Sequence, residues 1–144
     1  MIFTSVAGQN YFKLFLKKNF MTSAEKYDRG LDIADEMAPF LAKRLEELKP
    51  KFPEVIDHTI EYVLGDIYAR PGLDMRTKFI IAFTSCVANG NKSNITGYTR
   101  HLLHEGVSRK EIMDILIHIS AYAGFPAVWE ALGPVQEGLD AAAI

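Results

Sequence analysis

Cysteine is nearly absent from this sequence, which has one such residue, Cys86, among 144. A single cysteine excludes an internal disulfide and a zinc site made of four cysteines, and it fits a protein of a reducing compartment. We therefore expect a cytoplasmic protein. Cys86 lies within an apolar segment, where a thiol usually packs as a small hydrophobic side chain.

An excess of charge is also missing. The chain has 16 basic and 18 acidic side chains, for a formal net charge of −2. Such a balance offers no attraction for a polyanion, so we do not expect a nucleic-acid partner. The phosphate-binding loop motif, the dinucleotide glycine fingerprint and the Gly-x-Ser-x-Gly nucleophile motif are all absent. No cofactor is expected.

No apolar run is long enough to span a membrane. Residues 11–20 are apolar and basic, but Lys13 interrupts the apolar run and other lysines follow it, which is not the order of a signal peptide. We interpret residues 1–20 as an N-terminal extension and residues 21–144 as one domain. An amphipathic helix on a membrane surface is the alternative for the extension, but we expect no membrane partner.

The first part of the domain has the apolar spacing of helices. Ser23 is the expected cap of a helix that ends before Pro39, and a second helix covers residues 40–48. Pro53 suits the first turn of a third helix. Its expected apolar face contains Val55, Ile56, Ile60, Val63, Leu64 and Ile67.

A turn at residues 65–73 follows this helix. Pro71 cannot continue a helix, and Gly72 permits a change of chain direction. Tyr68 and Arg70 are therefore expected at a rigid corner. The alternative for Arg70 and the nearby Arg76 is that they only cap carbonyls or form surface ion pairs.

Four more helices are predicted after the turn. Asp74 is the expected N-cap of a central buried helix, because residues 79–83 are apolar on every side and the segment is too long for a typical strand. A helix over residues 92–105 follows. Ser108 and Glu111 then form the pattern of a capping box.

The last two helices are separated by Gly124, which should stop the helix that begins after Ser108. Pro126 should begin the final helix, and Gly133-Pro134 should kink or interrupt it. The complete pattern predicts an all-α protein: a single-domain bundle of about six to seven helices.

Histidines do not form a recognisable metal motif. His101 and His104 lie three residues apart and Glu105 follows, but His58 and His118 add no ligand spacing. We expect no metal site and interpret these histidines as ordinary helix residues.

Four segments together resemble the carboxymuconolactone decarboxylase family within the alkylhydroperoxidase-like superfamily. They match in order and spacing over about residues 26–139, and they comprise Tyr27–Gly30, Gly65–Leu73 with Arg76-Thr77, Gly106–Ile112 and Ala121–Ala127. The resemblance implies an all-α subunit that forms a homotrimer or homohexamer. It also implies a lyase of aromatic catabolism that removes CO2 from a carboxylated lactone without a cofactor.

Redox residues of the family's peroxidase branch are missing. Its Cys-x-x-Cys and the histidine that follows correspond to Asn91, Asn94 and Tyr98, and its glutamate corresponds to Phe79. Peroxide reduction by a dithiol is therefore disfavoured. The decarboxylase branch retains the histidine, so Tyr98 is a departure from that branch too.

Decarboxylation nevertheless suggests roles for particular residues. Arg70 and Arg76 are candidates to bind the carboxylates of a small anionic substrate, because a guanidinium is a bidentate donor. Tyr98 is the candidate donor to the developing charge and His101 a second acid. The expected apolar walls are Tyr68, Tyr122 and Trp129. The alternatives to an enzyme are a non-redox ligand-binding member and a structural oligomer of the same superfamily.

Overall fold

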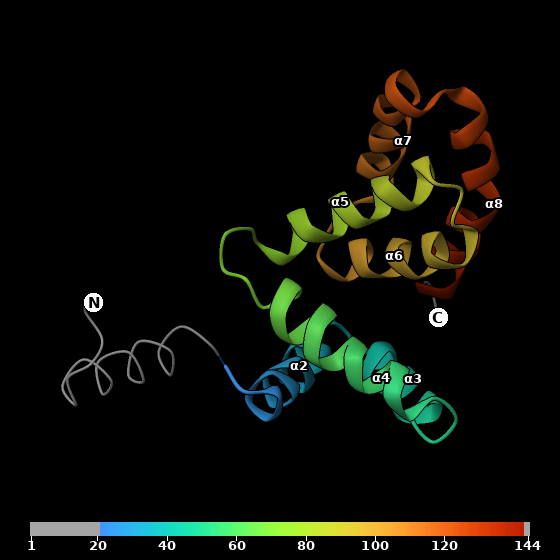
Figure 1. Cartoon of the computed structure of the whole chain (residues 1–144). Helices are drawn as coiled ribbons and strands as arrows, with labels where there is room; N and C mark the ends of the chain where they lie inside the picture. The colour runs from blue at the N-terminus through green and yellow to red at the C-terminus, as the bar shows by residue number, and fades with distance from the viewer. Residues whose placement is uncertain (1–20, 143–144) are drawn as a thin grey trace, which may run out of the picture. The chain divides into compact units, whose positions relative to one another are not determined.

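A computed structural model describes residues 21–142; the predicted N-terminal extension, residues 1–20, lies outside them. Every regular element in the described part of the chain is helical, which confirms the all-α prediction (Figure 1). There are seven described helices when the continuous segments α4 and η1 are counted together. The elements are α2 (Ser23–Met37), α3 (Pro39–Leu48), α4 (Pro53–His58), η1 (Thr59–Tyr68), α5 (Met75–Ala88), α6 (Lys92–His104), α7 (Arg109–Ala123) and α8 (Phe125–Ala142).

The chain divides into two compact units between Ala69 and Arg70. The first unit contains α2, α3, α4 and η1. Its first helix is capped by Thr22 rather than by the predicted Ser23: the Thr22 hydroxyl accepts the backbone N–H of Glu25, and the Glu25 carboxylate accepts the backbone N–H of Thr22. Serine and threonine cap helices in the same way, so the sequence alone did not separate them.

Two glycines bring α2 and η1 into backbone contact. A Cβ atom on Gly30 would lie 2.0 Å from the carbonyl oxygen of Ile60, and one on Gly65 would lie 2.1 Å from that of Lys26. Neither position has room for a side chain. The predicted Gly65 turn therefore begins later than expected, and Gly65 itself is a packing residue within a helix.

The buried face of the third helix differs from the predicted one. Buried residues recur every fourth position, at Ile56, Ile60, Leu64 and Tyr68, whereas Val55 is 64% exposed. Val55 lies in α4, and the chain continues from there as the π-helix η1, in which the Ala69 N–H bonds to the Leu64 carbonyl five residues earlier. Within η1, Val63 and Ile67, which the sequence placed on the apolar face, are 38% and 43% exposed.

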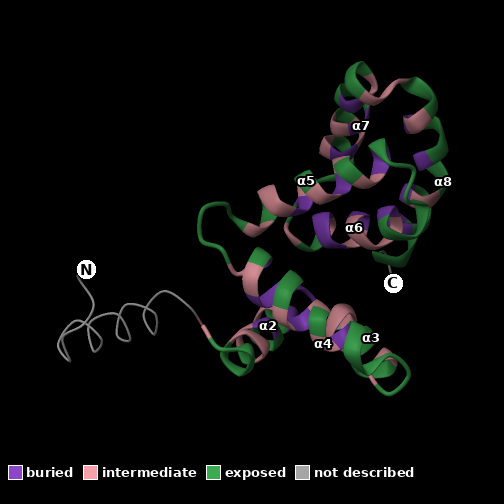
Figure 2. Ribbon diagram, viewed as in Figure 1, coloured by how far each residue is buried: buried purple, intermediate pink, exposed green. Residues whose placement is uncertain are grey.

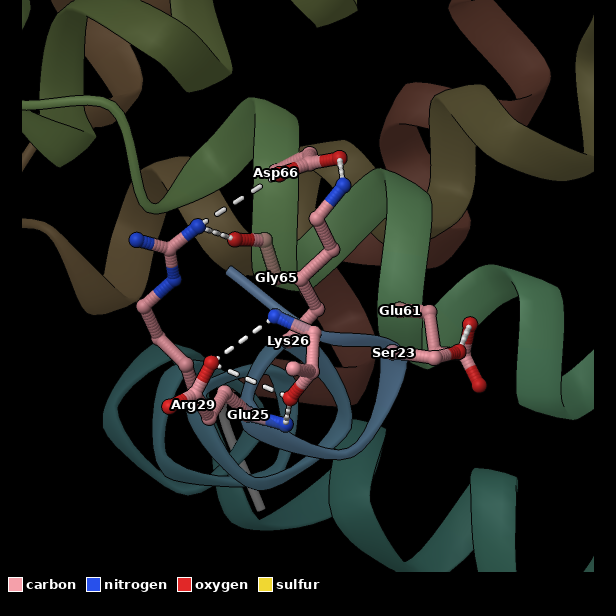
Figure 3. A network of polar contacts seen from close by, with 8 residues as sticks. Ser23, Glu25, Lys26, Arg29, Glu61, Gly65 and Asp66 are labelled. Atoms are coloured by element: carbon pink, nitrogen blue, oxygen red, sulfur yellow. Dashed lines mark hydrogen bonds and ion pairs between the residues drawn. The ribbon is translucent and has the colours of Figure 1, made fainter. Parts of the chain in front are cut away.

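Polar contacts also join α2 to η1 (Figure 3). Lys26 Nζ lies 2.6 Å from Asp66 Oδ2, and Arg29 donates to the Gly65 carbonyl and lies 3.5 Å from Asp66 Oδ1. The Ser23 hydroxyl donates to Glu61. Asp66 thus pairs with two basic side chains of a neighbouring helix.

The second unit contains α5 to α8, and its core includes one face of α5. Phe79, Phe83 and Val87 are buried, while Ile81 is 49% exposed. Figure 2 colours the ribbon by burial and shows α5 as buried only in part. The Asp74 side chain accepts the Thr77 N–H at 2.7 Å, which confirms the predicted N-cap. The prediction of a helix buried on every side is wrong for the single chain, since α5 has an open side.

The last two helices meet at Gly124, whose φ of 82° ends α7 as predicted. The Ser108 and Glu111 capping box is also confirmed. The final helix begins at Phe125 and runs through Pro134 to Ala142, so the predicted interruption does not occur. Packing on α6 holds it: a Cβ on Gly138 would lie 2.6 Å from Thr99 Cβ, which places the two helices in close contact.

Candidate functional site

A cluster of three rings lies between α5 and α6. Phe79, fully buried, stacks on His101 with ring centroids 4.6 Å apart and planes 10° from parallel. Tyr98 lies 6.3 Å from Phe79 and 6.0 Å from His101, centroid to centroid. The structure thus brings together Tyr98 and His101, the two predicted catalytic residues. It also places Phe79 and Tyr98, which occupy the glutamate and histidine positions of the resemblance, against each other.

His101 does not have the proton affinity expected of it. The residue is 5% exposed, and burial, followed by the nearby charges of His104 and Arg100, lowers its pKa to about 4. At neutral pH its imidazole is therefore uncharged. The prediction of His101 as a second acid did not include this burial, which the sequence does not reveal.

Arg76 lies at the side of α5 that faces α7. Its Nη2 donates to Glu111 Oε1, while Glu111 Oε2 accepts the backbone N–H of Ser108 at 2.8 Å. The hydrogen bonds from Ser108, and then the neighbouring Arg76, hold the pKa of Glu111 below its ordinary value. The cap of α7 therefore also positions the Arg76 guanidinium.

Two adjoining clefts lie along α5 and α7. The first, of about 400 Å³, is lined by Arg76, Ile80, Thr84, Glu111, Asp114, Ile115, His118 and Ile119. The second, of about 380 Å³, is lined by Thr84, Ser85, Ala88, His118, Ile119, Tyr122 and Ala123. We call the two together the α5–α7 cleft. Its size is within the range of small-molecule sites.

Three ionisable residues of this cleft were missed as candidates from the sequence: Glu111, Asp114 and His118. The signal was available, because Glu111, Asp114, His118 and Tyr122 follow one another at intervals of three, four and four residues and so share one face of α7. Nothing in the sequence showed that this face lies opposite Arg76.

The remaining predicted residues lie elsewhere or at the rim. Tyr122, 82% exposed, lines the second cleft with its ring 5.5 Å from that of His118. Trp129, 64% exposed, lies on α8 beside Phe125. Arg70 is exposed, and its carbonyl accepts a hydrogen bond from Lys78. Tyr68 is buried in the first unit.

Metal-ligating side chains do not converge in the described residues, where no three His, Cys, Asp or Glu side chains are grouped to hold an ion. Among the described helices, none has the length and apolar character needed to cross a membrane.

Comparison with known proteins gives a consistent result. The profile described as the Carboxymuconolactone decarboxylase family matches residues 53–137. The 4-carboxymuconolactone decarboxylase of Acinetobacter baylyi is 24% identical over 119 residues, which are 81% of this chain and 89% of that protein. The nitrosuccinic acid decarboxylase npaB of Metarhizium robertsii is 21% identical over 116 residues, 79% of this chain and 81% of that protein.

A third relative has no assigned activity. It is an uncharacterized 15.0 kDa protein of Paracoccus denitrificans, 25% identical over 126 residues, which are 86% of this chain and 89% of that protein. The family profile covers more than half of the chain, and the sequence resemblance is thereby confirmed. This chain belongs to the carboxymuconolactone decarboxylase family.

Proposed function

We propose that the protein is a cofactor-independent decarboxylase that acts on a small acid whose departing carboxylate is conjugated with, or next to, an electron-withdrawing group. The observation that carries the proposal is the similarity, over about four-fifths of the chain, to two proteins named as decarboxylases. One name denotes a lactone and the other a nitro acid. Both groups accept the electron pair that the departing CO2 leaves behind.

The reaction needs no external reactant. The bond between carbon and the carboxylate breaks, the electron pair moves onto an oxygen of the lactone or nitro group, and a proton then adds to carbon. A protein promotes these steps by holding the anion and placing hydrogen-bond donors near the developing charge. Arg76, the guanidinium held by Glu111 at the mouth of the α5–α7 cleft, is suited to hold an anion.

Tyr98 is the donor predicted from the sequence. Its side chain is half-buried beside Phe79, and a phenol is a hydrogen-bond donor at neutral pH. Its contribution is tested by Tyr98→Phe, which removes one hydroxyl and little volume.

A ligand-binding protein without turnover is the second candidate function. The observation in its favour is the ring cluster, where Phe79 and Tyr98 replace the two polar residues of the resemblance and leave an apolar contact. Such a protein would bind a small acid and release it unchanged.

Turnover separates the two candidates. The purified chain is incubated with 4-carboxymuconolactone and with nitrosuccinic acid, and CO2 release is followed against the uncatalysed rate. Release from at least one acid supports the enzyme. Thermal stabilisation by an acid that is never decarboxylated supports the binding protein. If neither CO2 release nor thermal stabilisation is observed, both candidate functions are contradicted.

A further inference from the structure

The α5–α7 cleft has a polar group at one end, an apolar floor and a ring at the other end. Arg76 marks the first end, and Tyr122 the second, with His118 lining both hollows. The floor is formed by isoleucines 80, 115 and 119. A volume of about 400 Å³ suits a ligand of few heavy atoms.

Charges around the cleft are largely balanced by local pairs. Arg76 pairs with Glu111, and Asp114 Oδ2 lies 2.7 Å from Lys110 Nζ, next to it on the outer surface of α7. A guanidinium has five N–H donors, and the bond to Glu111 uses one of them. Arg76 therefore has donors left for the carboxylate of a ligand.

In a substrate with two carboxylates, an arginine should bind the carboxylate that remains on the product and not the one that departs as CO2. Its negative charge leaves that group as CO2 forms, so a guanidinium bound to it would stabilise the substrate more than the transition state. A carboxylate that stays on the product can be held throughout the reaction. The apolar floor suits the departing group, because loss of hydration favours the neutral CO2 over the anion.

The geometry points to the α5–α7 cleft as the substrate site of the proposed decarboxylase, with a dicarboxylic acid as substrate, Arg76 on the retained carboxylate and His118 as proton donor. This inference rests on the proposed function. The names of the two relatives called decarboxylases denote acids with two carboxyl groups, which agrees with this substrate class.

His118 is the better donor by position. It is exposed to the cleft that Arg76 also lines, whereas Tyr98 contacts Phe79 on the α6 side of α5. An imidazole ring has an N–H that can donate a proton to a bound substrate. In the proposed step, the carbon–carboxylate bond breaks and CO2 leaves, and the electron pair of that bond is delocalised into the remaining substrate. His118 then transfers the proton of a ring N–H to the carbon, and a proton from the solvent restores the imidazole.

Binding and chemistry are tested separately with the full chain. Tricarballylate is the binding probe, because it has carboxylates but no group that accepts the electron pair, and amide chemical shifts locate it. The variants are Arg76→Gln, Arg76→Lys and His118→Gln. Arg109→Gln and His104→Gln are matched controls, since Arg109 bonds Gln136 and His104 is an exposed residue of α6; neither lines the cleft.

We expect tricarballylate to shift the amides of α5 and α7. Its dissociation constant should rise about tenfold or more in Arg76→Gln and less in Arg76→Lys, which keeps the charge. His118→Gln should leave this binding within about twofold but lower kcat for CO2 release about 100-fold. Both controls should stay within about twofold of the parent in each measurement.

Several results would overturn the inference. If the probe shifts amides around Tyr98 and not those of the cleft, or if His118→Gln decarboxylates as fast as the parent, the site lies elsewhere although decarboxylation stands. If the probe binds in the cleft and depends on Arg76 but no acid is decarboxylated, the proposed function and the role of His118 both fail. Thermal unfolding of each variant shows whether a lost activity is only lost folding.

Discussion

Arg76 on α5 and Glu111 on α7 form a charge-assisted hydrogen bond. Its acceptor, Glu111, is also the N3 residue of the capping box that begins α7. One carboxylate oxygen of Glu111 accepts a hydrogen bond from the Ser108 backbone N–H, and the other accepts one from Arg76 Nη2. The start of α7 and the orientation of the guanidinium are therefore coupled.

This coupling predicts that Glu111→Gln will affect function as well as the cap. A glutamine can still accept from Ser108 but loses the charge that orients Arg76, so KM should rise several-fold. Ser108→Ala is the comparison, because it weakens the cap and leaves the pairing of Arg76 with Glu111. If both variants raise KM equally, the effect comes from the helix end and not from Arg76. KM is measured from CO2 release.

His101 predicts a loss of stability in acid. Its pKa is about 4 in the folded chain and about 6.5 when exposed, so the unfolded state binds the proton more readily. The stabilising contribution is complete above pH 6.5 and is lost as the pH falls toward 4, by at most about 3 kcal/mol. Urea unfolding at pH 7.5, 5.5 and 4.5 measures this loss. It should be smaller in His101→Gln than in His58→Gln, which alters an exposed histidine that does not act on His101; equal losses in the two variants would contradict the assignment.

The contact between α2 and η1 predicts that Gly65→Ala is severely destabilising. The new Cβ would overlap the Lys26 backbone carbonyl, which cannot move as a side chain can, so we expect a loss of about 3 kcal/mol or more. Gly97→Ala and Gly133→Ala are matched controls in helices with open space at the Cβ position. Each should gain about 0.5–1 kcal/mol. Denaturant unfolding gives the three values, and a neutral Gly65→Ala would refute the close approach.

Exposed apolar side chains predict self-association of the chain. Ile117, Phe125 and Trp129 are each more than 60% exposed, which is unusual for large hydrophobic residues of one unit. We expect a homotrimer or homohexamer by light scattering, and Trp129→Glu should weaken it. If light scattering of the parent protein at micromolar concentration gives a mass of 16.2 kDa, the mass of one chain, the protein is a monomer and this prediction is contradicted.

Cys86 predicts the absence of thiol peroxidase activity. Burial raises the pKa of its thiol, which reduces the reactive thiolate, and the chain has no second cysteine to resolve an oxidised one. An alkyl hydroperoxide and a dithiol reductant should show no turnover above background. Turnover that disappears in Cys86→Ser would reverse this conclusion.

Helix boundaries were largely determined by the sequence itself, because caps are local. Asp74, Ser108 with Glu111, and Gly124 each act within a few residues of their own position, and each was predicted correctly. The family was likewise readable from short segments in a fixed order. Tyr98 and His101 could be placed together because they lie three residues apart on one helix.

Tertiary structure decided what depends on distant residues. The buried face of α4 and η1 excludes Val55 and Ile67, and α8 continues through Pro134 while it packs closely on α6. Burial against Phe79 lowered the pKa of His101, and the pairing with Glu111 set the position of Arg76. Each of these outcomes depends on which helix face packs against which, and that is a property of the whole fold and not of any local pattern of residues.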